Sequence, residues 1–210
     1  MAVSLTWVAH ATFRVADGAV VYIDPWKLQG QEQADIVLIT HSHYDHCSPE
    51  DVSKIAGDET VIIGPEECAS KFLANFRPAA AGSRFTVGDV EVAPVPAYNI
   101  DKQFHPRNKG WVGYLLEING KRIYHAGDTD FIPEMKDLKD LNVDVALLPV
   151  GGTYTMDAEE AAEAANVIEP KIAIPMHFGT IVGGASDADR FQQLCRVPVE
   201  VLSPGSALNL

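Results

Sequence analysis

The chain has 210 residues, 47% of them hydrophobic, and its 29 acidic against 16 basic residues give a formal charge of −13. This acidity excludes the basic surface of a nucleic-acid-binding protein, and no apolar run approaches the roughly 20 residues of a membrane-spanning helix. The length allows one domain or two small ones. Three widely spaced cysteines argue against a disulfide framework, so we expect a cytoplasmic protein, and its acidity predicts that it binds neither nucleic acid nor membrane.

The first half of the chain alternates between strand-like runs and short helical patterns. We expect strands at 6–15, 19–25, 34–40 and 60–64, and helices at 48–57 and 66–76. Asp17-Gly18 is a hairpin turn signal between the first two strands. Ser48 is a good N-cap for the first helix, and Pro49 suits its first turn.

Hairpins and buried strands continue in the second half. We expect a strand pair at 83–98, a hairpin at 111–127, strands at 143–151, 171–177 and 199–205, and helices at 133–141, 157–170 and 186–195. Asn119-Gly120 marks the tip of the hairpin, and Asp157 and Glu160 have capping-box spacing. This mixture predicts an α/β architecture of mixed sheets covered by helices.

The stretch HSHYDH places three histidines and an aspartate directly after the predicted strand 34–40. His41 and His43 are two residues apart, so in an extended chain both imidazoles reach one point. Asp45 and His46 follow in the turn and can face a second point close by. Imidazole and carboxylate ligands suit zinc, manganese or iron better than calcium or magnesium. Chance is a poor explanation for this pattern at the end of an apolar strand.

Two further strand ends carry residues of the same kind. His125, Asp128 and Asp130 lie in RIYHAGDTD, and His177 ends the strand KIAIPMH. Ligand sites in mixed α/β folds form where strands end, so we expect these side chains to meet the first cluster. His125 lies three residues before Asp128 and would point to the opposite face of a regular strand, so we do not count it as a ligand.

These motifs resemble those of the metallo-β-lactamase superfamily. HSHYDH fits its HxHxDH signature, and AGDT and MHFG fit its later aspartate and histidine motifs. WVAHATF, YIDP and GGTYTMD resemble its compact branch, which includes ascorbate-lactonase-like and N-acylphosphatidylethanolamine-phospholipase-like members. The resemblance extends from about Thr6 to Val201, nearly the whole chain, and so implies a single domain, 1–210. It implies an αββα sandwich of two mixed β-sheets with helices on the outer faces, and a one- or two-metal site at one edge.

The resemblance also implies a ligand set: the first metal is bound by His41 and His43, the second by Asp45, His46 and His177, and Asp128 bridges them. The family supplies a third histidine to the first metal near the end of the strand that reads APVPAYN in this chain, where Tyr98 and Asn99 stand instead. The nearest candidate is His105, in the loop IDKQFHPRNKG. It either folds back over the site or lies on the surface of its loop.

Four other residues near these motifs each have a structural alternative. His10 is a core histidine in the middle of its strand or, as the resemblance implies, supports the site close to the metals. Asp24 hydrogen-bonds a ligand imidazole or merely forms an Asp-Pro turn. Tyr154 reaches the substrate or caps the following helix. Cys47 packs in the core, since no free histidine is left to activate it as a nucleophile.

These residues predict a metal-dependent hydrolase that holds one or two divalent ions, with Zn²⁺ as first choice and Mn²⁺ or Fe as alternatives. Two ions sharing a water would lower its pKa to about 7, and the hydroxide would attack an ester, lactone, amide or phosphodiester of a small molecule. The candidate catalytic residues are Asp45, His10 and Tyr154, with Asp45 steering the nucleophile or moving a proton.

Two other classes of function remain as alternatives. An iron-dependent oxidoreductase would use the same ligands, although the chain lacks a flavin domain and rubredoxin-like cysteines. A non-catalytic metal-binding protein would keep the ligands without turnover. The loop 100–110 is the most basic local stretch. It either lids the site and contacts an anionic part of a small substrate, or it is a solvated loop.

Overall fold

The computed structural model describes residues 2–30, 32–72 and 75–210, and two β-sheets form its centre. The strands of the first sheet are β1 (Ser4–Ala9), β2 (Thr12–Asp17), β3 (Ala19–Ile23), β4 (Ala34–Leu38), β5 (Ala56–Gly64), β6 (Phe76–Pro78) and β13 (Ala207–Asn209). Those of the second are β7 (Phe85–Val87), β8 (Val90–Pro96), β9 (Val112–Ile118), β10 (Lys121–His125), β11 (Val145–Pro149) and β12 (Ile172–Met176).

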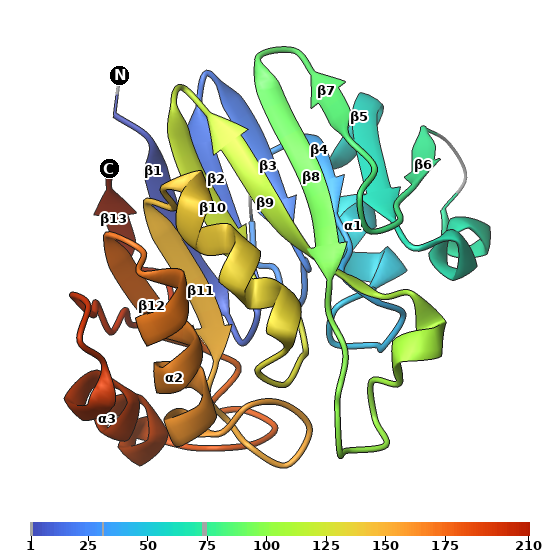
Figure 1. The fold of residues 1–210 in the computed structure, drawn as a ribbon. Coiled ribbons are helices and arrows are strands. Elements are labelled where there is room, and N and C mark those ends of the chain that lie inside the picture. The colour runs from blue at the N-terminus through green and yellow to red at the C-terminus, as the bar shows by residue number, and fades with distance from the viewer. Residues whose placement is uncertain (1, 31, 73–74) are drawn as a thin grey trace.

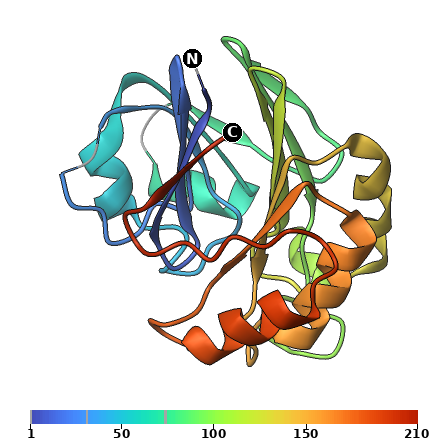
Figure 2. The ribbon, with the colours of Figure 1, turned by 90° about the vertical axis from the view of Figure 1, so that its left-hand side faces the viewer.

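Helices cover the outer faces of both sheets. The α-helices are α1 (Pro49–Ile55), α2 (Ala158–Ile168) and α3 (Ala185–Leu194), and the 3-10 helices are η1 (Glu66–Lys71), η2 (Arg107–Lys109) and η3 (Pro133–Leu141). In Figure 1, α2, α3 and η3 lie in front of the second sheet. Figure 2 shows α1 on the face of the first sheet that is turned away from the second sheet. The predicted αββα sandwich is confirmed. No helix in the described residues is both long and apolar enough to cross a membrane.

Both sheets are mixed, with antiparallel strands followed by parallel ones. The order is β13-β1-β2-β3-β4-β5-β6 in the first sheet and β12-β11-β10-β9-β8-β7 in the second. In the first, β3, β4 and β5 pair in parallel, and in the second, β10, β11 and β12 do so. Both hairpins predicted from Asp17-Gly18 and Asn119-Gly120 are confirmed, since β2 pairs with β3 and β9 with β10 in antiparallel register.

The alternation of side chains along β4 explains why the sandwich holds together. Ile36 and Leu38 face the second sheet and belong to the core between the two sheets. Val37 and Ile39 face the other way and pack with Ile55 of α1. Successive residues of a strand point to opposite faces, so an unbroken apolar run is what a strand buried on both faces requires. The prediction of such a strand at 34–40 is therefore confirmed.

The structure corrects the predicted strand at 6–15. This segment is two strands, β1 and β2, joined by a tight turn at His10, whose φ of 50° lies in the left-handed region. The interpretation of His10 as a mid-strand residue was therefore wrong. The turn carries no Gly, Asn or Pro to signal it. It is held instead from outside, because the Trp7 indole and the His177 amide both donate to the His10 carbonyl.

Three other predicted elements differ from the structure. The predicted strand 199–205 is reduced to one bridge, between Val199 and Ala173, and the chain ends instead in β13, which pairs with β1. The helices predicted at 66–76 and 133–141 are 3-10 helices, and no side chain caps either of them. Residues 73 and 74 of the first lie outside the described residues, and the chain has already turned into β6 at Phe76.

Candidate metal centre

The predicted ligands meet at one edge of the sandwich, where loops follow the carboxyl ends of strands that run in the same direction. His41, His43, Asp45 and His46 follow β4, His105 lies in the loop after β8, Asp128 follows β10 and His177 follows β12. His10 and Asp24 reach the same edge from the ends of β1 and β3. The expected convergence of separate strand ends is therefore what the structure contains.

A first cluster consists of three imidazoles. His41, His43 and His105 each offer one nitrogen, and these nitrogens lie within 4.8 Å of one another. The distance from His41 Nε2 to His43 Nδ1 is 3.0 Å. His105 is buried, and the centre of its ring lies 5.0 Å from that of each partner. Of the two alternatives left open by the sequence, the loop folds back and brings His105 over the site.

Asn99, which the sequence analysis did not assign a role, holds His105 in place. Its Oδ1 accepts hydrogen bonds from the His105 backbone amide, at 2.9 Å, and from Nδ1, at 3.0 Å. Its Nδ2 donates to Asp130 and to the Tyr154 carbonyl. With Nδ1 used as a donor, His105 directs the lone pair of Nε2 inward. The signal for this role was an amide at the position where a histidine was expected.

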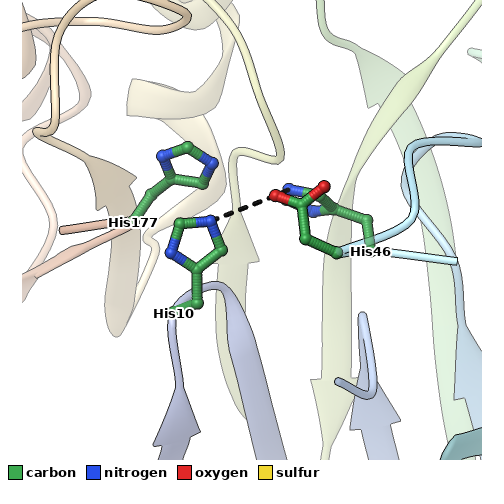
Figure 3. A group of neighbouring side chains, drawn as sticks. His10, His46 and His177 are labelled. Atoms are coloured by element: carbon green, nitrogen blue, oxygen red, sulfur yellow. Dashed lines mark ion pairs between the residues drawn. The ribbon is translucent and has the colours of Figure 1, made fainter. Parts of the chain in front are cut away.

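A second cluster surrounds the carboxylate of Asp45. Asp45, His46, His177 and also His10 each offer one ligand atom within 4.8 Å of the others, and Figure 3 shows the three rings turned toward one region. His10 Nε2 lies 3.3 Å from Asp45 Oδ2, and its Nδ1 lies 2.8 Å from the hydroxyl of Thr180. Burial lowers the pKa of His10 to about 4, so its ring is neutral at pH 7.

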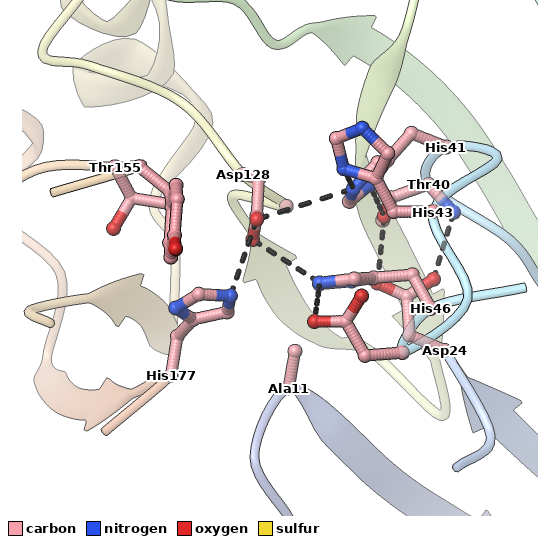
Figure 4. A network of polar contacts seen from close by, with 12 residues as sticks. Ala11, Asp24, Thr40, His41, His43, His46, Asp128, Thr155 and His177 are labelled. Atoms are coloured by element: carbon pink, nitrogen blue, oxygen red, sulfur yellow. Dashed lines mark hydrogen bonds and ion pairs between the residues drawn. The ribbon is translucent and has the colours of Figure 1, made fainter. Parts of the chain in front are cut away.

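Asp128 stands between the two clusters, as Figure 4 shows. Its Oδ2 lies 3.3 Å from His105 Nε2 and 3.1 Å from His177 Nε2, and its Oδ1 lies 3.4 Å from His46 Nε2. Gly127 makes this position possible, because its φ of 65° turns the chain and an added Cβ would lie 3.0 Å from the Val112 carbonyl. The carboxylate can therefore bridge two ions.

Asp24 supports the histidines from behind. The carboxylate is fully buried and accepts hydrogen bonds from the Thr40 amide at 2.8 Å, the Thr40 hydroxyl at 2.6 Å and His46 Nδ1 at 2.7 Å. The Thr40 oxygen in turn lies 2.9 Å from His41 Nδ1. Both histidines thus use Nδ1 as a donor and turn Nε2 toward the clusters, the arrangement that fixes the tautomer of a metal ligand. Of the two alternatives for Asp24, the structure therefore contains the hydrogen bond to an imidazole, that of the candidate ligand His46.

The electrostatics of the site suit cations. Six buried side-chain atoms of the described residues lack a hydrogen-bond partner, and all belong to these clusters: His10 Nε2, His46 Nε2, His105 Nε2, Asp128 Oδ1, and both ring nitrogens of His177. Buried polar atoms are normally satisfied, so such a concentration needs an explanation. Burial would lower the pKa of His46, but the carboxylates of Asp128, Asp24 and Asp45 raise it to about 10. The donor set therefore fits divalent metal ions.

Backbone strain accompanies these side chains. His10, Asp24 and His177 have φ values of 50°, 47° and 59°, which place each of them in the left-handed region. Residues other than glycine adopt this conformation at a cost of about 1–3 kcal/mol and persist in it where the surroundings enforce it. All three contribute to the same edge of the sandwich. Three of the nine non-glycine residues with positive φ in the described chain thus contribute to the candidate site.

Three other residues singled out from the sequence are Tyr154, His125 and Cys47, and their surroundings differ. Tyr154 lines the cavity over the two clusters. His125 uses Nε2 toward the Ala11 carbonyl and Nδ1 as acceptor from Gly127, so the prediction that it is not a ligand agrees with the structure. Cys47 is packed in the core beneath α1, as predicted.

The basic residues of the loop 100–110 are engaged with acids. Lys102 pairs with Asp130 at 2.7 Å, Arg107 with Glu134 at 2.9 Å, and Lys109 with Glu67 at 3.2 Å; these are the three cations of the loop. Asp130, which the sequence grouped with metal-type residues, also accepts from the Ile100 amide at 2.7 Å. It anchors the loop that carries His105.

Known proteins resemble this chain over its whole length. The model of a β-lactamase superfamily domain matches residues 4–177. A UPF0173 metal-dependent hydrolase of Koribacter versatilis is 35% identical, with 96% of this chain and 95% of that protein covered. Another, of Pyrococcus furiosus, is 32% identical, with 99% and 100% covered. The solved structure of Igni18, a metallo hydrolase from Ignicoccus hospitalis, has 28% identity, covers 100% of this chain and 99% of its own, and superposes with a TM-score of 0.82.

Proposed function

The chain belongs to the β-lactamase superfamily, among the UPF0173 metal-dependent hydrolases, and from this premise we propose that it uses two divalent ions to hydrolyse an ester, lactone, amide or phosphodiester of a small molecule. One observation carries the proposal. Two groups of metal-type side chains flank Asp128, and all the buried side-chain atoms of the described residues that lack a hydrogen-bond partner belong to these groups or to Asp128.

The residues divide into two sets. The first ion would be held by His41, His43 and His105, the second by Asp45, His46 and His177, and Asp128 would join them. Zn²⁺ is the ion that imidazole and carboxylate ligands favour first, and Mn²⁺ and Fe are the alternatives. When bound, such ions supply Lewis-acid activation of water and of the scissile carbonyl or phosphoryl group.

Asp45 is the residue best placed to handle a proton. Burial opposes its ionisation, but the contact with His10 and the charge of His46 lower the pKa of Asp45, so the carboxylate is ionised at neutral pH. It lines the cavity above the clusters. Its oxygen can orient the attacking water or accept its proton and pass it to the leaving group. His10 would position that carboxylate, and Tyr154, which also lines the cavity, would contact the substrate.

The test is hydrolysis of ester, lactone and phosphodiester panels by metal-loaded protein, with Asp128→Asn as the inactive variant. Loss of Asp128 should lower kcat/KM by roughly 10²-fold or more, as for other groups that stabilise a transition state. Asp89→Asn is the matched control, because Asp89 is exposed in the turn between β7 and β8. Equal activity in the two variants would exclude the proposal. Iron in natively purified protein, with oxygen consumed and no ester cleaved, would favour an oxidoreductase instead.

A further inference from the structure

A small cavity opens directly above the two clusters. Its volume is about 250 Å³. Its floor is formed by residues assigned to the metal centre: His43, Asp45, His105, Asp128 and His177. Ligand pockets for drug-sized molecules start at roughly 300 Å³, so this cavity suits a substrate with few atoms around the reacting bond.

Apolar side chains surround the cavity. Tyr44, Phe104 and Ile181 line it, and they remain 67%, 46% and 40% exposed. They are three of the six large hydrophobic residues that are exposed in the described part of the chain. Each comes from a different loop, after β4, β8 and β12. Exposed apolar residues scattered singly need no explanation, but their gathering around one cavity does.

The aromatic side chains of this wall are supported by neighbours. The Phe104 ring meets Tyr154 edge to face, with 4.6 Å between ring centres, and Tyr44 meets Trp26 in the same way at 6.1 Å. Such pairs restrict the rings and keep their remaining surface turned toward solvent. The apolar wall is therefore built into the loops.

Charge complementarity argues against an anionic substrate. None of the described residues that line the cavity is a lysine or an arginine. The loop cations Lys102, Arg107 and Lys109 are paired with acids, and Arg107 also lies over the Tyr98 ring at 4.8 Å. The loop was expected to contact an anionic part of the substrate, but each of its lysine and arginine side chains is already paired with an acidic residue. Apart from the ions that the floor of the cavity would hold, an anionic group of the substrate would find no lysine or arginine on the walls to replace its hydration.

We propose that the substrate is a neutral carboxylic ester or lactone that carries a short apolar group against Tyr44, Phe104 and Ile181. This inference rests on the proposed function and narrows its substrate class. Water adds its oxygen to the acyl carbon, and the acyl C–O bond breaks with its electron pair going to the alcohol oxygen. A proton from the water ends on that oxygen, so an ester gives an acid and an alcohol, and a lactone gives a single hydroxy acid.

The test compares 4-nitrophenyl acetate, propionate, butyrate and valerate with the anionic 4-nitrophenyl succinate, using metal-loaded full-length protein. Each added methylene should raise kcat/KM about threefold to fourfold until the wall is covered, and succinate should fall below butyrate. Phe104→Ala and Ile181→Ala should each flatten this increase. Leu141→Ala is the control, since Leu141 is also exposed but lines another cavity. Hydrolysis with no dependence on chain length, or a preference for succinate, would overturn the inference while leaving the proposed hydrolase intact.

A binding measurement tests the apolar wall separately from the proposal that the protein is a hydrolase. Butyrate, valerate and succinate are titrated calorimetrically into the metal-loaded protein, where no turnover is needed. Affinity that rises from butyrate to valerate, exceeds that for succinate and is lost in Phe104→Ala supports the apolar wall even if no ester is cleaved. Sedimentation velocity tests whether the same side chains instead form an interface between two copies of the chain. A dimer that dissociates in Tyr44→Ser would mean that these side chains form an interface between copies of the chain, and would refute the substrate assignment.

Discussion

Replacing Asn99 with alanine should weaken the first metal site selectively. The Asn99 side chain makes four hydrogen bonds, two of them to His105 and one each to Asp130 and the Tyr154 carbonyl. The substitution removes the side-chain acceptor of His105 Nδ1 and leaves only the Tyr154 carbonyl, at 3.1 Å, which itself loses its hydrogen bond from Asn99 Nδ2. Loss of such a supporting partner typically lowers metal affinity 10–100-fold, or by about 1.4–2.8 kcal/mol. The second cluster shares no hydrogen bond with Asn99, so its affinity should be unchanged.

The assay is competition between the protein and a chromophoric zinc chelator, which resolves the two binding steps. Asn99→Asp is the informative companion, because it keeps the acceptor for His105 but sets a second carboxylate beside Asp130. Asn99→Asp should lower the stability of the protein, yet it should reduce the metal affinity of the first site less than Asn99→Ala does. Tyr114→Phe serves as a control for a general loss of stability. If Asn99→Ala unfolds earlier but binds both ions as tightly as wild type, or if both sites weaken equally, the positioning role is refuted.

Three further predictions concern stability. The Tyr114 hydroxyl donates to the carbonyls of Ile39 and Ile63 and so ties the second sheet to the first, and Tyr114→Phe should cost about 1–3 kcal/mol in urea unfolding. Burial opposes the ionisation of Asp51, but Lys54, Ser48 and two backbone amides lower its pKa overall. The stability that this carboxylate contributes is therefore present above the unfolded pKa of about 3.9 and is lost as pH falls through the lower folded pKa. The difference in Tm between wild type and Asp51→Asn should therefore be large at pH 7 and shrink toward zero in acid; a difference that persists at pH 2 contradicts this. Chelation of the metal should lower Tm by about 5–10 °C, since ions at a hundredfold excess over Kd stabilise the folded state by about 2.7 kcal/mol, and an unchanged Tm would argue against a built metal site.

Elements with a strong local signal could be predicted from the sequence. The strand β4 was recognisable because both of its faces are buried, and α2 because Asp157 and Glu160 form a capping box that the structure contains. The ligands after β4, β10 and β12 could be predicted for the same reason: strand ends in a mixed sandwich share an edge. In each case the local pattern and the tertiary structure require the same residues.

Features that depend on distant contacts could not be predicted. The turn at His10 is enforced by Trp7 and by the amide of His177, which lies far along the chain. β13 forms only because β1 offers it an edge, and its residues Ala207–Asn209 have little strand character of their own. The place of His105 was equally hidden. Nothing in a loop of mixed polar residues shows that it folds back, until Asn99 and Asp130 are seen to anchor it.

The loop after β8 would link the proposed metal site to substrate selection. His105 belongs to the first cluster and the preceding residue, Phe104, lines the cavity, so under the two proposals one loop would supply both a metal ligand and a contact to the substrate. Asp130 holds the start of this loop through the Ile100 amide and Lys102, and Lys102 also lies 3.4 Å from Glu160 of α2. A histidine at the end of β8 would bind the ion without constraining the loop. By placing the ligand in the loop, the chain makes the position of the apolar wall depend on the same contacts that complete the metal site.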